Sequence, residues 1–247
     1  MATDLGEVLG RETLAVGELM HLMGDPVYRG VDVPRGDGRL VLVLPGLFAN
    51  DLYLQPLRRW LRRVGYRPVR STLAINVGCP ERLCVQIESE LARQRERHGG
   101  PVSIIGHSRG GILARAIAAR LQADAATLVL LGSPVGAVLR MPSWSSAAMA
   151  IDPPARRRVT DAGTSFRRMI DPDCNVPECG CAFPPDLRRP LHPRTRVVSI
   201  YSRDDPIVPA AACPVQGARN VEVGGSHSGL AFNVAVYREL GSALAAG

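Results

Sequence analysis

The sequence predicts an α/β fold, in which a mostly parallel sheet of about six strands is flanked by helices. Short segments rich in valine, leucine and isoleucine alternate with helical segments along most of the chain. Several of the short segments are apolar at every position, which is typical of strands buried on both faces. The length fits a single domain of this class, covering residues 1–247.

Most of the expected strands are followed by a turn and a helix, the order that right-handed crossovers of a parallel sheet require. The run LVLVL at 40–44 is the clearest buried strand. The expected strands are 40–44, 66–71, 102–105, 127–131, 196–201 and 220–223, and the expected helices are 55–65, 81–97, 112–121 and 230–244.

Two regions lie outside this alternation. Residues 1–38 carry a helical pattern that ends near Gly24, and they predict an N-terminal helical extension that covers the sheet. Residues 135–194 mix proline, arginine and cysteine with short apolar pieces between two core strands. Insertions at the carboxyl edge of a parallel sheet lie where ligands bind, so we interpret 135–194 as a cap or lid over a site. The alternative is that it merely covers the sheet edge.

The net charge is +7, and all 30 basic residues are arginine. The densest basic stretch, at 55–66, places its arginines (Arg58, Arg59, Arg62 and Arg63) opposite an apolar helical face. This is typical of a solvated helix face, so we expect no nucleic-acid partner. No apolar run approaches the length of a membrane span, and the first residues lack a signal-peptide pattern. We therefore expect a cytoplasmic protein without a transmembrane segment.

The cysteine content is high for a cytoplasmic protein. The spacing of the cysteines matches no strong zinc-finger pattern, and disulfides that pin the 135–194 loop are the favoured prediction. Free thiols, or a metal site that combines the cluster at 174–181 with Cys213, are the alternatives. The six cysteines are Cys79, Cys84, Cys174, Cys179, Cys181 and Cys213.

The run PVSIIGHSRGG at 101–111 contains the main candidate site. An apolar strand leads into Gly106-His107-Ser108-Arg109-Gly110, and an alanine-rich helical segment follows. This strand, sharp turn and helix form the context of a G-x-S-x-G nucleophile elbow, in which small residues let the backbone present a serine hydroxyl. Ser108 is therefore the candidate nucleophile.

A serine hydroxyl needs a neighbouring base, and the base needs an orienting carboxylate. His227 lies in the loop GGSHSG just after the last expected strand and is the candidate base, whereas the other histidines, including His107, are interpreted as structural. The acid is expected in SRDDPIVP after the strand 196–201. Asp205 is preferred because Pro206 fixes an extended turn beyond the strand, and Asp204 is the alternative.

Attack of the serine on a carbonyl carbon creates an oxyanion, which needs two convergent N–H donors. The backbone N–H of Arg109 is one candidate by position. The second is expected in the turn after the strand 40–44, where Leu47 is preferred and Phe48 is the alternative. Since both donors are backbone groups, we expect the side chains of these residues to be available to line an acyl pocket.

The motifs LPGLF, GHSRGG, YSRDDPIVP and GGSHSG together resemble those of the α/β-hydrolase superfamily, and within it the compact bacterial lipase and esterase branch. The resemblance covers residue 40 to the C-terminus, and it departs from the family at Pro45, where many members carry histidine. It implies hydrolysis of small or lipid esters through an acyl-enzyme on Ser108, with no metal or organic cofactor. Thioester cleavage or acyl transfer on the same triad is one alternative, and a non-catalytic binding protein on the same fold is another.

Overall fold

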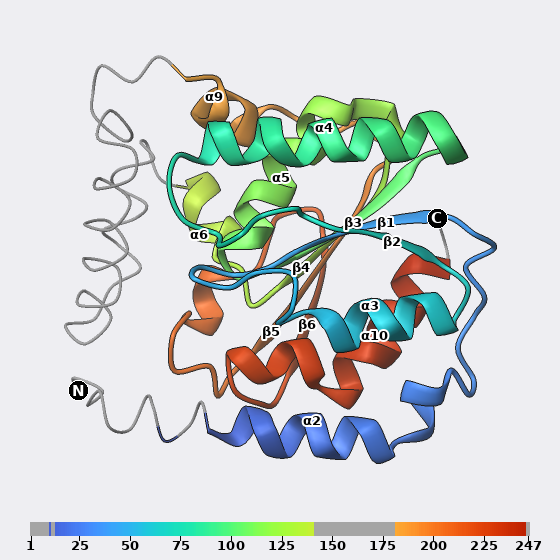
Figure 1. The fold of residues 1–247 in the computed structure, drawn as a ribbon. Coiled ribbons are helices and arrows are strands. Elements are labelled where there is room, and N and C mark those ends of the chain that lie inside the picture. Colours follow the sequence, from blue (N-terminus) through green and yellow to red (C-terminus); the bar gives the residue numbers. More distant parts are fainter. Residues whose placement is uncertain (1–9, 11–12, 141–180, 246–247) are drawn as a thin grey trace.

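A computed structural model describes residues 10, 13–140 and 181–245 of the chain. Its centre is a six-stranded sheet with the order β2-β1-β3-β4-β5-β6, and every neighbouring pair of strands is parallel. Figure 1 shows the sheet between two layers of helices. The strands are β1 (Leu40–Leu44), β2 (Arg67–Val69), β3 (Val102–His107), β4 (Ala125–Leu131), β5 (Arg196–Ser202) and β6 (Arg219–Val223).

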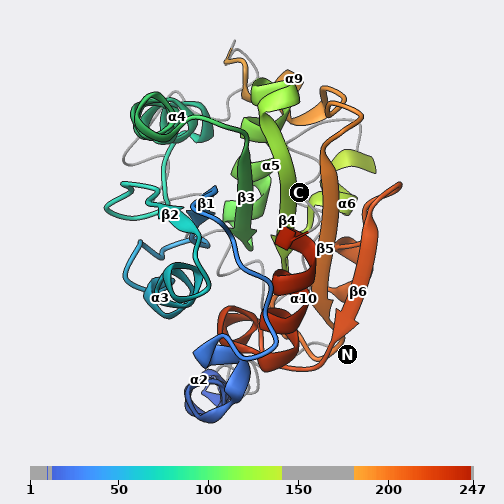
Figure 2. The same cartoon turned by 90° about the vertical axis from the view of Figure 1, so that its right-hand side faces the viewer.

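The helices cover both faces of the sheet, as the two views of Figures 1 and 2 show. One layer holds α4 (Pro80–His98), α5 (Arg109–Leu121) and α9 (Phe183–Arg188), and the other holds α3 (Gln55–Arg63) and α10 (Val234–Ala245). Neighbouring residues of β1 alternate between the two apolar cores, because successive side chains of a strand point to opposite faces. All five residues of β1 are buried, which confirms a strand covered on both sides.

The predicted elements are present, with shifts of a few residues at their ends. The helix α5 begins at Arg109 and not at residue 112, because it starts immediately after the turn at Ser108. The predicted helix 230–244 is divided into the short 3-10 helix η4 (Ser228–Phe232) and α10. The fold class predicted from the sequence is therefore confirmed.

The N-terminal extension differs from the prediction in where it packs. Its helix α2 (Leu14–Gly24), followed by the 3-10 helix η1 (Pro26–Arg29), contacts η4 and α10 and lies outside the sheet layers. Leu22 is fully buried, but Leu14 and Met20 of the predicted apolar pattern are 60% and 69% exposed. The expectation that this helix covers the sheet was wrong, because α10 and η4 already occupy that face.

The predicted cap, 135–194, lies largely outside the described residues, which omit 141–180. Its two described ends pack against the body of the domain. Val135 and Val138 of α6 (Val135–Arg140) and Phe183 and Leu187 of α9 belong to the apolar core beneath α5. The cap remains an expectation for the residues between them.

The disulfide prediction is wrong for the four cysteines within the described residues, Cys79, Cys84, Cys181 and Cys213, because no disulfide joins any two of them. Cys84 and Cys213 are fully buried in separate apolar clusters. Burial raises the pKa of the Cys213 thiol to about 12, so this sulfur stays protonated. Cys174 and Cys179 lie outside the described residues.

The basic face of α3 is solvated only in part. Arg59 and Arg62 are exposed, as expected, but Arg58 is buried and forms an ion pair with Asp51 at 2.7 Å. The guanidinium of Arg63 lies over the ring of Tyr28, 4.7 Å from its centroid. Within the described part of the chain, no helix is long and apolar enough to cross a membrane.

Candidate active site

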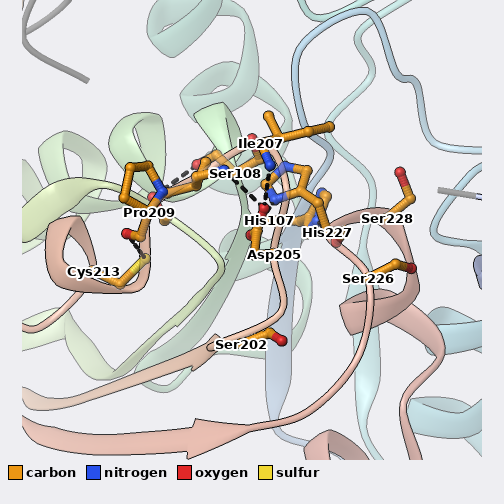
Figure 3. A network of polar contacts seen from close by, with 12 residues as sticks. His107, Ser108, Ser202, Asp205, Ile207, Pro209, Cys213, Ser226, His227 and Ser228 are labelled. Atoms are coloured by element: carbon orange, nitrogen blue, oxygen red, sulfur yellow. Dashed lines mark hydrogen bonds and ion pairs between the residues drawn. The ribbon is translucent and has the colours of Figure 1, made fainter. Parts of the chain in front are cut away.

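The predicted site residues come from loops that leave the same edge of the sheet. In parallel strands the carboxyl ends meet at one edge, and the register pairs Leu44 of β1 with Gly106 of β3 and Leu131 of β4 with His107. The loops after β1, β3, β5 and β6 therefore converge there. Figure 3 shows Ser108, Asp205 and His227 gathered in one polar network.

Ser108 occupies the tight turn between β3 and α5. Its backbone adopts φ 52° and ψ −124°, a conformation that L-residues avoid and that marks local strain. Two contacts with the end of β4 and the turn after it hold Ser108: its N–H donates to Leu131 O at 2.8 Å, and the Ser133 hydroxyl donates to Ser108 O at 2.7 Å. The turn has the geometry that the elbow motif predicts.

Three glycines make this turn sterically possible. A Cβ atom at Gly106 would lie 2.5 Å from Gly110 O, and one at Gly110 would overlap Leu44 O. A Cβ at Gly111 would lie 2.6 Å from Ser133 Cβ. Since two of these clashes are with backbone atoms, no side-chain movement would relieve them.

Asp205 and His227 form a buried hydrogen-bonded pair. His227 Nδ1 lies 2.6 Å from Asp205 Oδ2, and both side chains are almost completely buried. The other carboxylate oxygen of Asp205 accepts the backbone N–H groups of Ile207 and Val208, each at 2.7 Å. The carboxylate is thus held rigidly, and it directs the Nδ1–H of His227, which leaves Nε2 as the basic nitrogen.

Asp204, the alternative acid, is placed differently. Its side chain is exposed, and its backbone N–H donates to the Ser202 hydroxyl at 3.0 Å. The structure therefore brings Asp205 to His227 and leaves Asp204 at the surface. The turn after Asp205 accounts for the difference, because Asp205 Oδ1 accepts the N–H groups of Ile207 and Val208, which fixes the carboxylate.

His107 also contacts the candidate base. Its Nε2 lies 2.9 Å from His227 O, and the two ring centroids are 4.9 Å apart. Burial, and next the proximity of His227, lower the pKa of His107 from 6.5 to about 3, so the ring is neutral and donates through Nε2. Its Nδ1, which has no hydrogen-bond partner within the described residues, faces Gly46. His107 thus joins the elbow to the loop of His227.

The turn after β1 is held by a residue that the sequence did not single out, the buried Asn76. Its side-chain amide donates to Pro45 O at 2.7 Å, and its backbone carbonyl accepts the N–H of Phe48 at 3.3 Å. The Phe48 donor is therefore engaged, which favours Leu47 as the predicted second donor. Gly46 passes close to Ser108, since a Cβ there would lie 3.2 Å from Ser108 Cβ.

The side chain of Arg109, which we expected to be available to line an acyl pocket, binds the loop that precedes α4. Its guanidinium donates to the side-chain oxygen of Asn76 and, at 2.8 Å, to the carbonyl of Gly78. This ties the start of α5 to the turn after β1. The position after Ser108 is close enough to the loop at 76–78 for a long side chain to reach acceptors there.

The loop that carries His227 is held by two further residues from distant parts of the chain. The Tyr53 hydroxyl donates to Ser228 O at 2.5 Å, and the carboxylate of Glu18 on α2 accepts the hydroxyl of Ser226 at 2.6 Å. No local signal in the sequence marks either residue. In the described ranges no cluster of three histidine, cysteine or acidic side chains could hold a metal ion.

Solved structures share this architecture. One of the metagenome-derived lipolytic enzymes LipS and LipT matches with a TM-score of 0.54 and 16% identity, covering 87% of this chain and 96% of that one. The chain has the α/β-hydrolase fold. A lipase-esterase related protein from Clostridium acetobutylicum, at 13% identity, and a marine microorganism esterase, at 15%, share this hydrolase fold, each with a TM-score of 0.51 over 85% of this chain and 97% of the other. No protein-family model and no curated protein matches the sequence.

Proposed function

We propose that this chain is a serine hydrolase that cleaves carboxylic esters through an acyl-enzyme on Ser108. The observation that carries the proposal is the strained turn at Ser108, which lies at the same sheet edge as the buried pair of Asp205 and His227. A strained serine conformation at a strand-to-helix turn has no evident structural use, whereas it exposes a hydroxyl for attack.

In this mechanism His227 Nε2 takes the proton of the Ser108 hydroxyl as the oxygen attacks the ester carbonyl. Asp205 keeps the Nδ1–H directed and stabilises the imidazolium that forms. The neutral His107 next to it adds no competing positive charge, because its pKa is lowered to about 3 by burial. His227 then returns the proton to the leaving alcohol.

The oxyanion of the tetrahedral intermediate would be stabilised by the backbone N–H groups of Arg109 and Leu47. The Arg109 N–H lies at the first turn of α5, where helix N–H groups lack intrahelical partners and the helix dipole is positive. The network of Asn76 around Pro45 and Phe48 keeps the opposite turn in place. Such preorganised donors supply most of the transition-state stabilisation in acyl transfer.

Carboxylic esters are proposed because the structural neighbours above are named as lipolytic enzymes and esterases. In the second half-reaction, water activated by His227 attacks the acyl carbon, releases the acid and restores the Ser108 hydroxyl. Esters of short and medium chain length are the first substrates to test.

The test is turnover of p-nitrophenyl esters of increasing acyl length by the full-length chain. We expect hydrolysis that falls by at least about 1,000-fold in Ser108→Ala, the size of effect seen when a triad member is removed. Ser89→Ala is the matched control, because this exposed serine of α4 donates only to Val85 O of its own helix. Unchanged turnover in Ser108→Ala would refute the proposal.

A further inference from the structure

The N-terminal helix α2 reaches the loop of His227 through a single carboxylate. Glu18 Oε2 accepts the hydroxyl of Ser226 at 2.6 Å, and Glu18 Oε1 accepts the backbone N–H of the same residue at 3.3 Å. Ser226 is 2% exposed and directly precedes His227. The contact joins residues 208 positions apart in the chain.

The loop around His227 is shaped to receive this carboxylate. A Cβ atom at Gly225 or at Gly229 would overlap an oxygen of Glu18, so both glycines leave the space that the side chain fills. Gly225 also has φ 120°, a conformation that favours glycine. The Ser226 hydroxyl, while donating to Glu18, accepts the N–H of Gly229 at 3.0 Å. The Ser226 hydroxyl, held by Glu18, thus links the residue before His227 to Gly229, two residues after it.

We propose that Glu18 is a positioning residue that sets the orientation of His227. The proposal rests on the proposed function, in which His227 Nε2 must meet the Ser108 hydroxyl. A misplacement of about 1 Å in such a site lowers the rate by up to about 100-fold. The contact from Glu18 comes from a helix outside the sheet layers, so α2 takes part in holding this loop.

The alternative is that Glu18 only anchors α2 to the domain. Other contacts do this as well: Leu22 is fully buried against the core, and Asp25, directly after α2, pairs with Arg238 of α10 at 3.3 Å. Leu22→Ala should therefore weaken the packing of α2 while it leaves the hydrogen bonds between Glu18 and the loop at 224–229 (the histidine loop) in place. It is the matched control for variants of Glu18.

The experiment compares Glu18→Ala, Glu18→Gln and Leu22→Ala by ester turnover and by denaturant unfolding. We expect Glu18→Ala to lower kcat about 10- to 100-fold with little change in KM, and Leu22→Ala to lower stability further while kcat stays near that of the wild type. Glu18→Gln keeps one acceptor for the Ser226 hydroxyl but turns an N–H₂ group toward the Ser226 N–H, so it should fall between the wild type and Glu18→Ala. The proposal is overturned if kcat in all three variants follows the loss of stability.

A second readout does not depend on turnover. The proton between His227 Nδ1 and Asp205 Oδ2 should give a downfield proton NMR signal, identified by its loss in Asp205→Ala. We expect this signal to broaden or shift in Glu18→Ala and to persist in Leu22→Ala. An unchanged signal in Glu18→Ala contradicts the positioning role. The NMR signal could change in Glu18→Ala while the wild-type protein shows no Ser108-dependent turnover. That result would contradict the proposed function but not the positioning of His227 by Glu18.

Discussion

The elbow at 106–111 and the histidine loop at 224–229 lie side by side, but they are held in different ways. The elbow depends on backbone contacts and on glycines that leave no room for a Cβ atom. The histidine loop depends on side chains that reach it from elsewhere: Asp205, His107, Tyr53 and Glu18. A position set by backbone sterics is fixed by local sequence, whereas one set by side-chain hydrogen bonds depends on residues far away in the chain.

The difference predicts how the two regions respond to substitution. A change in the elbow should destabilise the whole domain, because Cβ atoms at Gly106 and Gly110 would clash with backbone atoms of α5 and β1. A change in the side chains around the histidine loop should lower activity more than stability, since each hydrogen bond contributes only about 1 kcal/mol to folding. The following substitutions test this contrast.

The largest effect on activity is expected for Asp205→Asn. An asparagine would favour the wrong tautomer of His227, and kcat/KM should fall about 1,000- to 10,000-fold, as for the equivalent change in other triads. Asp204→Asn is the matched control, because this neighbouring side chain is exposed and should leave turnover within about twofold. The measurement is kcat/KM with one p-nitrophenyl ester. Equal losses of kcat/KM in the two variants would contradict the assignment of Asp205, and not Asp204, as the triad acid.

Gly110→Ala should have the largest effect on stability. The new Cβ would overlap Leu44 O, and β1 and α5 would have to separate, at a cost of about 3 kcal/mol in the free energy of unfolding. Gly17→Ala is the control, since a Cβ there meets nothing within 4 Å and alanine should stabilise α2 by about 0.5 to 1 kcal/mol. Urea unfolding measures both. A Gly110→Ala protein as stable as the wild type would show that sterics do not hold the elbow.

His107 joins the two regions and predicts a pH dependence. Its pKa falls from 6.5 to about 3 on folding, so the unfolded chain binds more protons between these values and stability decreases as the pH falls below 6.5. Between pH 7.5 and 4.5 His107 should account for a loss of about 2 to 3 kcal/mol. In His107→Gln this contribution to the pH dependence of the free energy of unfolding should disappear. Above pH 7.5 the free energy of unfolding should change with pH equally in the two proteins. Parallel stability curves down to pH 4.5 would contradict the burial of a neutral ring.

Asn76→Ala should have the smallest effect. It removes the donor to Pro45 O and leaves the guanidinium of Arg109 without one acceptor, which should cost about 1 to 2 kcal/mol in stability. We also expect kcat to fall about 10-fold as the proposed oxyanion turn loosens. Asn220→Ala, which breaks a comparable turn contact at Val215, is the control and should retain kcat. A retained kcat in Asn76→Ala would show that the turn needs no such support.

Sequence patterns were sufficient for the parts of the molecule that depend on local rules. The alternation of buried strands predicted the six-stranded parallel sheet, and the glycines around Ser108 predicted the strained turn. The choice of Asp205 depended on the turn at Pro206, and it agrees with the hydrogen bond to His227. Each of these features depends on residues that are close together in the sequence, so it can be predicted without knowledge of the tertiary contacts.

The supports of the site could not be predicted, because they depend on tertiary structure. Asn76 lies in an irregular loop with no periodic pattern, and the role of Glu18 depends on a contact across 208 positions. The contact of the Arg109 side chain with the loop that contains Asn76 was likewise not predicted. Such partners emerge only when the topology places their loops together.

The most direct test of the account is the site of labelling by a fluorophosphonate probe, determined by peptide mass mapping of the native full-length protein. An activated serine attacks the phosphorus and releases fluoride, so the probe marks the nucleophile covalently. We predict modification of Ser108, strongly reduced in His227→Ala and absent after denaturation. Modification of a different serine, or none in the folded wild-type protein, would contradict the assignment of Ser108 as the nucleophile.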